Sequence, residues 1–327
     1  MSLAESINTP LNDCIHPIRI PTPFMVGDVF SYLIKDEKIV LVDCGHHSDE
    51  TEEILQAEFK DKNLSLSDID EIWLTHGHPD HFGMAKNLRD LSDATIFGHS
   101  KEQNNFGNNE DAVRFEKFFE QNGVPKKLNN LMQEQLQWLQ EWQLWLTPDR
   151  WVDEKSELST GSIAFSVEHL PGHAPGHVAF YNDDLIFGGD VLIDHISTNA
   201  VINFDPDTGK RNKSLLQQRS SLQWMARQTG CVLPGHGNII KNPQAVAEKH
   251  LNEQNLRYNQ VVNFLKTRDN FLSLYEITKA LMPQINQPEQ VYLTLSEIMG
   301  YLDWAIENND AERAVEKDVV KFGDRSN

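Results

Sequence analysis

Histidine is the residue that first suggests chemistry in this 327-residue sequence, which contains 13 of them. Three histidines and one aspartate fall within six residues, as His76, His78, Asp80 and His81, directly after an expected strand. Imidazole nitrogens and carboxylate oxygens are ligands for borderline metals such as Zn²⁺, Fe and Mn²⁺. The pattern therefore indicates a transition-metal site, against the alternative of a polar loop that carries a chance cluster of histidines.

Three later loops repeat this placement. His173 lies in the run PGHAPGH, Asp190 ends the run FGGD, and His236 lies in PGHG. Each loop follows an expected strand, and α/β sheets build their sites just past the strand ends. The neighbouring glycines permit tight turns and a close approach of the backbone. Each signal is weak alone, but the four loops together are specific.

The elements that must position these loops alternate between strands and helices, which is typical of an α/β domain. Short apolar runs bounded by turn residues predict the strands, and periodic runs predict the helices. The expected strands cover residues 30–34, 39–43, 71–75, 94–98, 162–169, 178–181, 185–187 and 231–233, with helices at 48–60, 81–91 and 213–229.

Residues 101–155 interrupt this alternation with a polar, aromatic and helical stretch. Trp138, Trp142 and Trp145 are spaced i, i+4 and i+7, which predicts one face of a helix. That face either packs the helix onto the domain or forms the apolar wall of a substrate pocket.

The C-terminal part of the sequence turns helical at residues 246–267, 273–281 and 288–308, and ends in an alternating run over 314–322 that suits a hairpin. Three helices and a hairpin predict a winged-helix-like module. The expected domains are a catalytic domain over 1–248, with the helical insertion at about 101–155, and this module over 249–327.

The four loops, read together as HxHxDH, a later histidine, GD and PGHG, resemble the metallo-β-lactamase superfamily over about residues 15–245, and within it the glyoxalase II-like hydrolases. The resemblance implies an α/β fold, a four-layered αβ/βα sandwich with a dinuclear site on one edge. It implies two divalent transition-metal ions, of which Zn²⁺ is the expected identity and Fe or Mn are the alternatives. By position, the implied ligands are His76, His78 and His173 for one metal, Asp80, His81 and His236 for the other, and Asp190 as the bridge.

The same resemblance implies roles beyond ligation. Two metals can share a water, lower its pKa and polarise a scissile carbonyl or phosphoryl oxygen, and Asp80 is the expected catalytic residue that orients the attacking hydroxide. Asp43 matches an acidic residue that hydrogen-bonds a ligand histidine, against a plain turn carboxylate. His177 matches a histidine that is not a ligand, for which a structural hydrogen bond is favoured over substrate contact. His195 is near the motif loops and either lines the pocket or is packed or solvated.

We therefore expect a metal-dependent hydrolase of a small ester, thioester or lactone. The alternative is a phosphodiesterase or endoribonuclease of the same superfamily, in which Lys210, Arg211 and Lys213 would meet phosphate. A non-catalytic protein that keeps the fold is a third possibility, but a scaffold has no need of seven intact ligand positions. A flavodiiron activity is disfavoured because those relatives carry a glutamate where this chain has His78.

Charge narrows the expected partners to a small-molecule substrate. The chain has 29 Lys and Arg against 49 Asp and Glu, a formal charge of −20, which disfavours nucleic acid and anionic membranes. The expected third helix of the tail, 288–308, has no Lys or Arg to neutralise phosphates. A nucleic-acid partner is therefore disfavoured, and the tail is better interpreted as an interaction module that supports a homo-oligomer.

No apolar run is long enough for a membrane span, and the cysteines form no paired motif, so the cytoplasm is the expected location.

Overall fold

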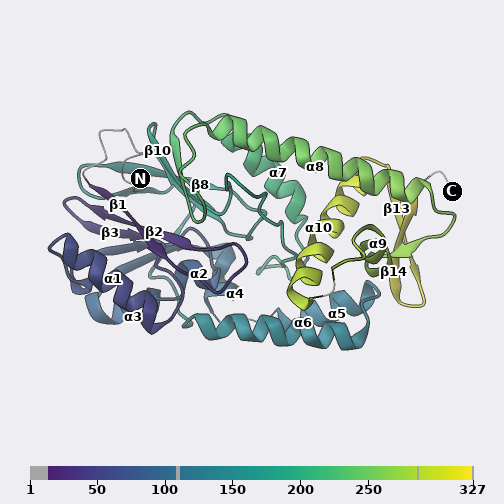
Figure 1. Ribbon diagram of the computed structural model, residues 1–327, viewed down its shortest axis with the longest axis horizontal. Coiled ribbons are helices and arrows are strands. Elements are labelled where there is room, and N and C mark those ends of the chain that lie inside the picture. The colour runs from purple at the N-terminus through teal and green to yellow at the C-terminus, as the bar shows by residue number, and fades with distance from the viewer. Residues whose placement is uncertain (1–13, 108–110, 286, 326–327) are drawn as a thin grey trace.

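Figure 1 shows the computed structural model of the chain, which describes residues 14–107, 111–285 and 287–325. The first of its sheets has the strand order β1-β2-β3-β4-β5-β6. These strands are β1 (Ile15–Ile20), β2 (Val29–Lys35), β3 (Ile39–Val42), β4 (Glu71–Trp73), β5 (Thr95–His99) and β6 (Arg150–Val152). The first three pair antiparallel, whereas β3 to β6 run parallel. The carboxyl ends of the parallel strands therefore meet at one edge of the sheet.

The second sheet has the order β11-β10-β9-β8-β7. Its strands are β7 (Glu157–Ser159), β8 (Ala164–His169), β9 (Val178–Tyr181), β10 (Leu185–Gly189) and β11 (Cys231–Pro234). The two sheets pack face to face over an aromatic core, in which the fully buried Trp73 lies 5.6 Å from Phe165 and 5.4 Å from Phe180, measured between ring centroids. Such close packing holds the strand ends of both sheets at fixed positions.

Helices cover the outer face of each sheet. On the first sheet lie α1 (Asp49–Asp61) and α3 (Ala85–Ser92), which bury Leu55 and Leu88 against Leu41 and Ile72. On the second lie α7 (Ser214–Met225) and the first turns of α8 (Pro243–Lys266). Ser48 caps α1 as its position predicts, because its hydroxyl accepts a hydrogen bond from the Thr51 amide at 3.1 Å. The predicted four-layered α/β sandwich is confirmed.

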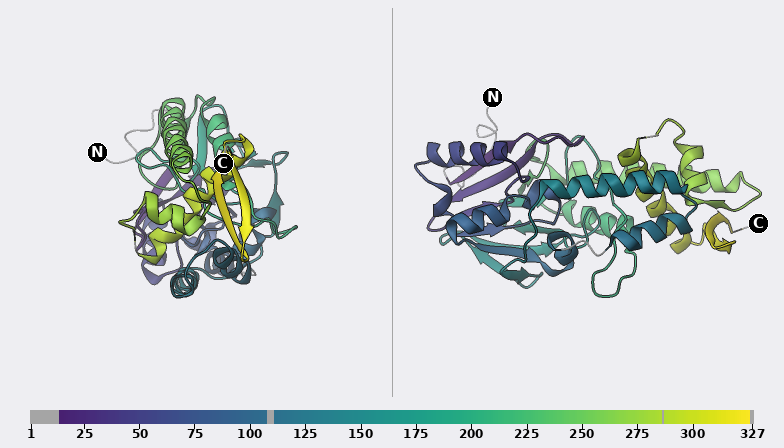
Figure 2. Two further views of the ribbon diagram at one scale, coloured as in Figure 1. Left: turned by 90° about the vertical axis from the view of Figure 1, so that its right-hand side faces the viewer. Right: turned by 90° about the horizontal axis from the view of Figure 1, so that it is seen from below.

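The elements on the right of Figure 1 combine two distant parts of the chain. From the insertion come α5 (Ala112–Gln121) and α6 (Lys126–Leu139), and from the C-terminal part come the rest of α8, α9 (Leu274–Leu281) and α10 (Pro288–Glu307). The short α4 (Gln103–Phe106) of the insertion instead lies beside the sandwich, where Phe106 belongs to the buried core of the first sheet. A small antiparallel sheet of order β12-β14-β13 completes this half, with β12 (Leu272–Ser273), β13 (Ala311–Glu316) and β14 (Val319–Asp324). Figure 2 shows α5 and α6 alongside the C-terminal elements from below.

One apolar core joins these two parts. Phe119 and Met132 of the insertion belong to the same buried cluster as Leu295 and Leu302 of α10. The boundary predicted at residues 248 and 249 falls inside α8, which runs unbroken from Pro243 to Lys266. The division into two domains and the winged-helix-like description of the tail stay predictions.

The prediction that Trp138, Trp142 and Trp145 lie on one face of a single helix is wrong. Helix α6 ends at Leu139, a short 3₁₀ turn, η4 (Gln140–Trp142), follows, and Trp145 lies in the irregular segment after it. Trp138 and Trp142 still meet, with ring centroids 5.7 Å apart, and both lie against Phe24. No glycine or proline marks the end of α6 before Pro148, so the sequence carried no stop signal there.

The helix expected at 81–91 is divided into α2 (Pro79–Phe82) and α3. At the break, a Cβ on Gly83 would lie 2.4 Å from the Trp142 carbonyl oxygen and 2.5 Å from the His47 amide nitrogen. The glycine thus permits the insertion to approach the backbone that carries the histidine motif.

Helix α10, the helix that would read DNA in a winged-helix protein, is enclosed in the molecule. It contacts α6, α7, α8, α9 and β13, and Leu295, Ile298 and Leu302 along it are fully buried. Among the helices in the described ranges, none has both the length and the apolar character needed to cross a lipid bilayer.

Candidate metal centre

The seven candidate ligands converge at one edge of the sandwich, from loops that leave four different strands. His76 and His78 follow β4, Asp80 and His81 lie on α2, and the remaining candidates follow β8, β10 and β11, as His173, Asp190 and His236. Their donor atoms form three overlapping groups, each with all atoms within 4.8 Å of one another. The groups are His76, His78 and His173; His76, His81 and Asp190; and Asp80, His81 and His236.

The first cluster consists of His76, His78 and His173. His78 Nδ1 lies 3.0 Å from His76 Nε2 and 2.8 Å from His173 Nε2. His173 donates from its other nitrogen, Nδ1, to the Asn199 carbonyl oxygen at 3.1 Å, which leaves Nε2 with a lone pair. Burial and the nearby His173 lower the pKa of His78 to about 3, and burial with His81 holds the pKa of His76 well below its usual value. These imidazoles are therefore neutral at pH 7, which is the state that binds metal.

The second cluster consists of Asp80, His81 and His236. His236 Nε2 lies 3.3 Å from Asp80 Oδ2. His81 Nδ1 donates to Asp43 Oδ2 at 2.8 Å, and His236 Nδ1 donates to the Asp28 carbonyl oxygen at 2.8 Å, so both rings turn Nε2 inward. Both histidines have no solvent exposure.

Charge in the second cluster differs from that in the first. Burial disfavours the imidazolium form, but the carboxylates of Asp190, Asp43 and Asp80 outweigh it and raise the pKa of His81 well above its usual value. Against the same burial, Asp190 and Asp80 raise the pKa of His236. The neighbouring histidines overcome burial to lower the pKa of Asp80 to about 2. The second cluster therefore places carboxylates beside imidazoles whose pKa values are raised, in contrast to the lowered pKa values of the first cluster.

Asp190 lies between the two clusters. Its Oδ2 is 3.5 Å from His173 Nε2 and 3.6 Å from His236 Nε2, and its Oδ1 is 3.4 Å from His81 Nε2. The approach depends on Gly235, where a Cβ would lie 2.4 Å from Asp190 Oδ1. His177 accepts a hydrogen bond from the Asp190 amide at 3.0 Å and stacks on His76 at 4.8 Å between centroids. It thus has the structural position favoured from the sequence.

Buried polar atoms in the site show what it can accept. His81 Nε2, His236 Nε2 and Asp190 Oδ1 are buried, and the described residues offer none of them a hydrogen-bond partner. Burying such atoms alone is costly, and proteins seldom do it. Imidazole nitrogen with carboxylate oxygen is a donor set of Zn²⁺ and related divalent ions. The residues present fit divalent metal ions.

Asp43 supports both clusters. It follows β3 at a positive φ of 54°, accepts from the Thr75 amide at 2.8 Å and from the Thr75 hydroxyl at 2.7 Å, and holds His81. Thr75 Oγ1 in turn lies 3.0 Å from His76 Nδ1. One carboxylate therefore orients a histidine of each cluster, as the sequence suggested for one of them.

Glu102 is a supporting residue that the sequence analysis missed. It is fully buried, and burial raises its pKa. Its Oε2 accepts from the Gly77 amide at 3.0 Å and from Asn105 Nδ2 at 2.6 Å, while Oε1 accepts from the Gly176 amide at 2.5 Å. Gly77 separates His76 from His78, so Glu102 ties the first histidine loop to the loop of His173. No motif surrounds Glu102 that could have signalled this.

The other residues singled out from the sequence lie apart from the clusters. His195 is half exposed and lies 3.0 Å from Asp194 Oδ1 through Nδ1. Arg211 makes two hydrogen bonds to Asp303 on α10, at 2.7 and 2.6 Å, and Lys213 is paired with Glu307. The two cations therefore attach their loop to α10 through ion pairs.

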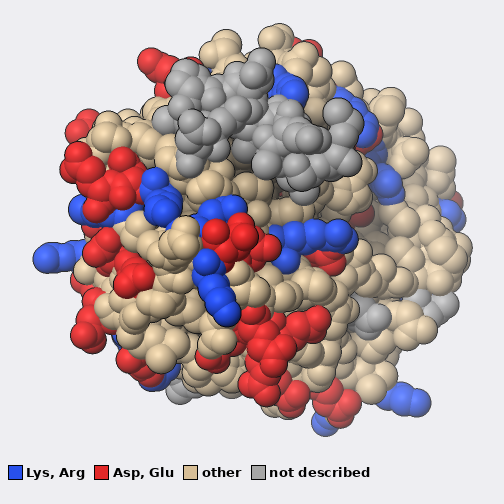
Figure 3. Space-filling model, turned by 60° about the vertical axis from the view of Figure 1, so that its left-hand side comes forward, with Lys and Arg blue, Asp and Glu red and all other residues tan. Residues whose placement is uncertain are grey.

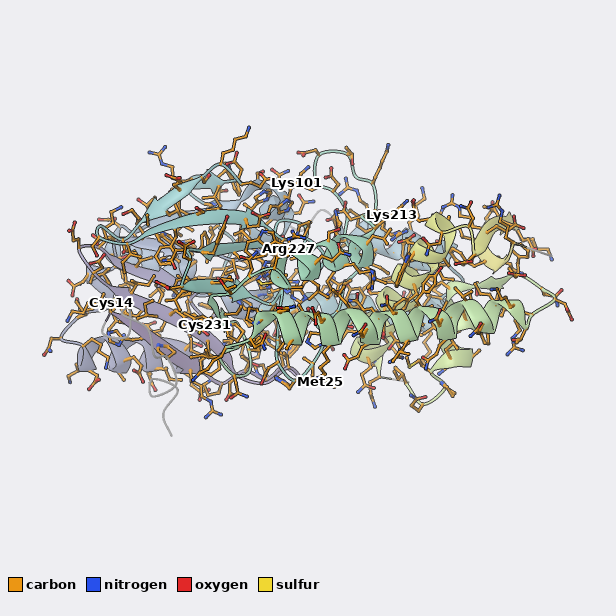
Figure 4. All side chains as sticks on the ribbon, turned by 90° about the horizontal axis from the view of Figure 1, so that it is seen from above. Cys14, Met25, Lys101, Lys213, Arg227 and Cys231 are labelled. Carbon is orange, nitrogen blue, oxygen red and sulfur yellow. The ribbon has the colours of Figure 1, made fainter. Side chains whose placement is uncertain are left out.

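A cavity of about 540 Å³ opens beside the clusters. His78, Asp80, His173 and Asp190 line it at the metal end. Its other walls come from the loop 23–26, α4 to α6, residues 196–203 and the first turns of α10. In Figure 4 the labelled Met25, part of this lining, lies near the middle of the long axis, between the sandwich and the C-terminal elements.

The sandwich and the paired His and Asp clusters define a class, the metal-dependent hydrolases with the metallo-β-lactamase fold. The family model described as "Metallo-beta-lactamase superfamily" matches residues 25–236, and the chain belongs to this superfamily.

Curated relatives agree with this class. "Probable metallo-hydrolase YqjP" of Bacillus subtilis is 29% identical over 297 residues, which cover 88% of this chain and 90% of the relative. "Hydroxyacylglutathione hydrolase GloC" of Haemophilus influenzae is 33% identical over 170 residues, which cover 50% of this chain and 65% of the relative. The chain is therefore a metal-dependent hydrolase with relatives of the glyoxalase II type, as the sequence predicted.

Two solved structures share the fold over nearly the whole chain. A metallo-beta-lactamase family protein from Thermus thermophilus has a TM-score of 0.81 at 21% identity, covering 96% of this chain and 99% of its own. A beta-lactamase domain protein from Burkholderia ambifaria has a TM-score of 0.80 at 19% identity, covering 97% and 93%. The C-terminal elements therefore have counterparts in proteins of this fold.

Proposed function

We propose that the chain hydrolyses a carboxylic ester, thioester or lactone with water activated between two divalent metal ions, most simply Zn²⁺. The observation that carries this proposal is the position of Asp190, whose two oxygens face histidines of both clusters while one of them lacks any other partner. One ion would be held by His76, His78 and His173, and the other by Asp80, His81 and His236. Asp190 would contribute a ligand to each ion.

When bound, the two ions supply a water with a pKa near ~7 and polarise the scissile carbonyl. The role of Asp80 follows from its charge. A carboxylate whose pKa is lowered to about 2 stays ionised at pH 7 and is a weak base. Asp80 therefore acts by accepting a hydrogen bond from the attacking water and orienting it, at the metal end of the cavity that it lines. His81 and His236 are kept in one ring orientation by Asp43 and by the Asp28 carbonyl.

The phosphodiesterase alternative is less well supported. Of the three cations expected to meet phosphate, Lys210, Arg211 and Lys213, the last two are paired with Asp303 and Glu307. Helix α10 is enclosed and has no Lys or Arg, so it offers no surface for a nucleic acid. On the face of the molecule in Figure 3, basic and acidic side chains are interspersed, without a continuous basic patch. A small-molecule substrate fits these observations better. A homo-oligomer formed through residues 249–327 and a cytoplasmic location stay predictions.

A substrate panel tests the proposal. Protein loaded separately with Zn²⁺, Mn²⁺ and Fe²⁺, with its metal content measured, is assayed on carboxylic esters, thioesters, lactones and a bis-aryl phosphodiester. We expect hydrolysis of at least one carboxylic substrate, and its loss with metal in His78→Ala. A phosphodiester turned over faster than every carboxylic substrate, or a His78→Ala variant with unchanged metal content and rate, would overturn the proposal.

A further inference from the structure

The cavity beside the metal clusters differs in character between its two ends. At the metal end its lining is polar. Away from the metals the lining is mainly apolar, contributed by the insertion, the 196–203 segment and α10. These apolar residues include Phe115, Met132, Leu136, Ile202, Tyr292 and Leu293. A volume of about 540 Å³ is in the range of small-molecule sites, about 300–1,000 Å³.

Charge in the cavity is confined to the metal end. Across the described ranges 14–107, 111–285 and 287–325, no Lys, Arg or Glu lines it, and the acidic lining residues are Asp80 and Asp190. The remaining polar lining consists mostly of side-chain amides, among them Asn105, Gln135 and Asn203. A substrate group that carries carboxylates or phosphates would lose its hydration there without gaining a cationic partner. The cavity therefore suits an uncharged group.

One face of α6 gives the length of the apolar wall. Met132, Leu136 and Leu139 line the cavity at spacings of i, i+4 and i+7, which place them on one side of the helix. With a rise of 1.5 Å per residue, the distance from Met132 to Leu139 is about 10 Å along the helix axis. Met132 also belongs to the core shared with α10, so it marks the distant end.

The mouth of the cavity exposes apolar side chains. Met25 is 75% exposed, Ile196 38% and Trp145 37%, and all three line the cavity. Exposed apolar side chains gathered around one cavity are typical of a ligand site, since their exposure to water is otherwise unfavourable.

We propose that the substrate carries an extended, uncharged acyl chain of roughly eight carbons, which lies along α6 with its end against Tyr292 and Leu293 of α10. This inference rests on the proposed ester or thioester hydrolysis and adds the class of acyl group. It also assigns a role to the C-terminal part of the chain, because α10 forms the end of the acyl site.

A chain-length series tests this assignment on the metal-loaded protein. Aryl esters and thioesters from acetyl to dodecanoyl are compared by kcat/KM. Each buried methylene is expected to contribute about fourfold, so the six extra methylenes of octanoyl should raise kcat/KM over acetyl by up to about 4,000-fold, with no further gain beyond the length of the cavity. An acetyl substrate preferred over octanoyl, or a preference for a carboxylate-terminated chain, would overturn the acyl assignment.

Matched variants test where the acyl chain of the substrate binds. Leu136→Trp fills the middle of the cavity and should lower kcat/KM for octanoyl at least tenfold while the acetyl rate stays within about twofold. Leu131→Trp on the same helix is the control, since Leu131 is 38% exposed and does not line the cavity. Leu293→Trp repeats the test from α10, in case the first variant does not fold. Equal losses for acetyl and octanoyl substrates in both cavity variants would contradict the assignment.

Binding provides a readout that does not depend on turnover. Octanamide, an uncharged and unreactive probe, is titrated into metal-free and metal-loaded protein while tryptophan fluorescence is followed, because Trp138 and Trp145 line the cavity. We expect saturable binding that Leu136→Trp abolishes and Leu131→Trp preserves. Binding of octanamide together with no hydrolysis of any carboxylic substrate would reject the proposed function alone. Hydrolysis of acetyl esters without octanamide binding would reject the acyl site alone.

Discussion

The two candidate metal clusters differ although they lie side by side and Asp190 lies between them. The first is formed by three histidines and opens to the cavity through His78 and His173. The second contains a carboxylate, and its two histidines are fully buried. The first cluster is composed of neutral ligands, whereas the raised pKa values of His81 and His236 make protons stronger competitors for a metal ion in the second. One site can thus combine a ligand set that is ready for metal with one whose occupancy depends on pH.

Substitution of Asp80, which belongs to the second cluster alone, should lower the rate of hydrolysis more than any other change discussed below. Asp80→Asn removes the charge that orients the attacking water, so kcat should fall by about 10²–10⁴ with a smaller change in KM. Steady-state kinetics on the substrate found by the panel, with metal content measured for each preparation, gives the answer. Full kcat with both metals bound would contradict the catalytic role, and loss of a metal together with activity would support ligation alone.

Asp43 should have a smaller effect that extends to both clusters. Asp43→Asn weakens the acceptor of His81 and of Thr75, which contacts His76. Loss of such a supporting carboxylate typically costs 10–100-fold in metal affinity or activity. Metal titration should show the larger loss at the second cluster, where the contact to His81 is direct.

Asp28→Asn is the matched control for Asp43. Asp28 holds His236 through its main-chain carbonyl, while its side chain pairs with Arg19, so the variant should keep normal metal affinity. Equal losses in Asp28→Asn and Asp43→Asn would show that the effect is not specific to the Asp43 hydrogen bonds.

The residues of both clusters were predictable because they are chemically distinctive and occur in loops just past strand ends. Seven histidines and aspartates in four motifs were expected as ligands from the resemblance to the superfamily, and the structure brings their donor atoms together. The main-chain carbonyls of Asp28 and Asn199, which orient His236 and His173, carry no sequence signal, since every residue has a carbonyl. Glu102 contacts Gly176 across 74 residues of sequence, a pairing that only the fold creates.

The fold was predictable for a similar reason. Apolar runs and periodicity indicated most strands and helices of the sandwich, but not β6 and β7, which have three residues each, nor the six-residue β1. Pro17 interrupts the alternation of β1, and a proline inside an apolar run weakens its prediction as a strand. The shared core of the insertion and α10 was not foreseen, because the pattern of each segment shows that it buries a face but not against what.

Lowering the pH of the metal-loaded protein should remove the metal of the second cluster before that of the first. The raised pKa values of His81 and His236 mean that protons compete for these ligands even near neutral pH, whereas the pKa of His78 is about 3. As pH falls, the second metal should therefore leave first, with an apparent affinity that drops about tenfold per pH unit for each proton taken up. Metal content measured between pH 8 and pH 4.5 should fall from two ions to one. Simultaneous loss of both ions would mean that the clusters do not differ in this way.

Glu102 should have the smallest effect on the metals, and it should act on the first cluster. Glu102→Ala leaves the buried amides of Gly77 and Gly176 without their acceptor, at a cost of about 1–3 kcal/mol each in the free energy of unfolding. The loops of His76, His78 and His173 then lose their common anchor, and metal affinity at the first cluster should fall by less than the 10–100-fold expected for Asp43.

Glu102→Gln restores one acceptor and should recover part of both the stability and the metal affinity that Glu102→Ala loses. Glu58→Ala, which removes an exposed carboxylate on α1, is the control and should change stability by no more than about 0.5 kcal/mol. Denaturant unfolding of the metal-free proteins measures the first quantity and metal titration the second. A Glu102→Ala variant that loses stability but binds the first metal normally would show that Glu102 supports the fold without positioning the histidine loops.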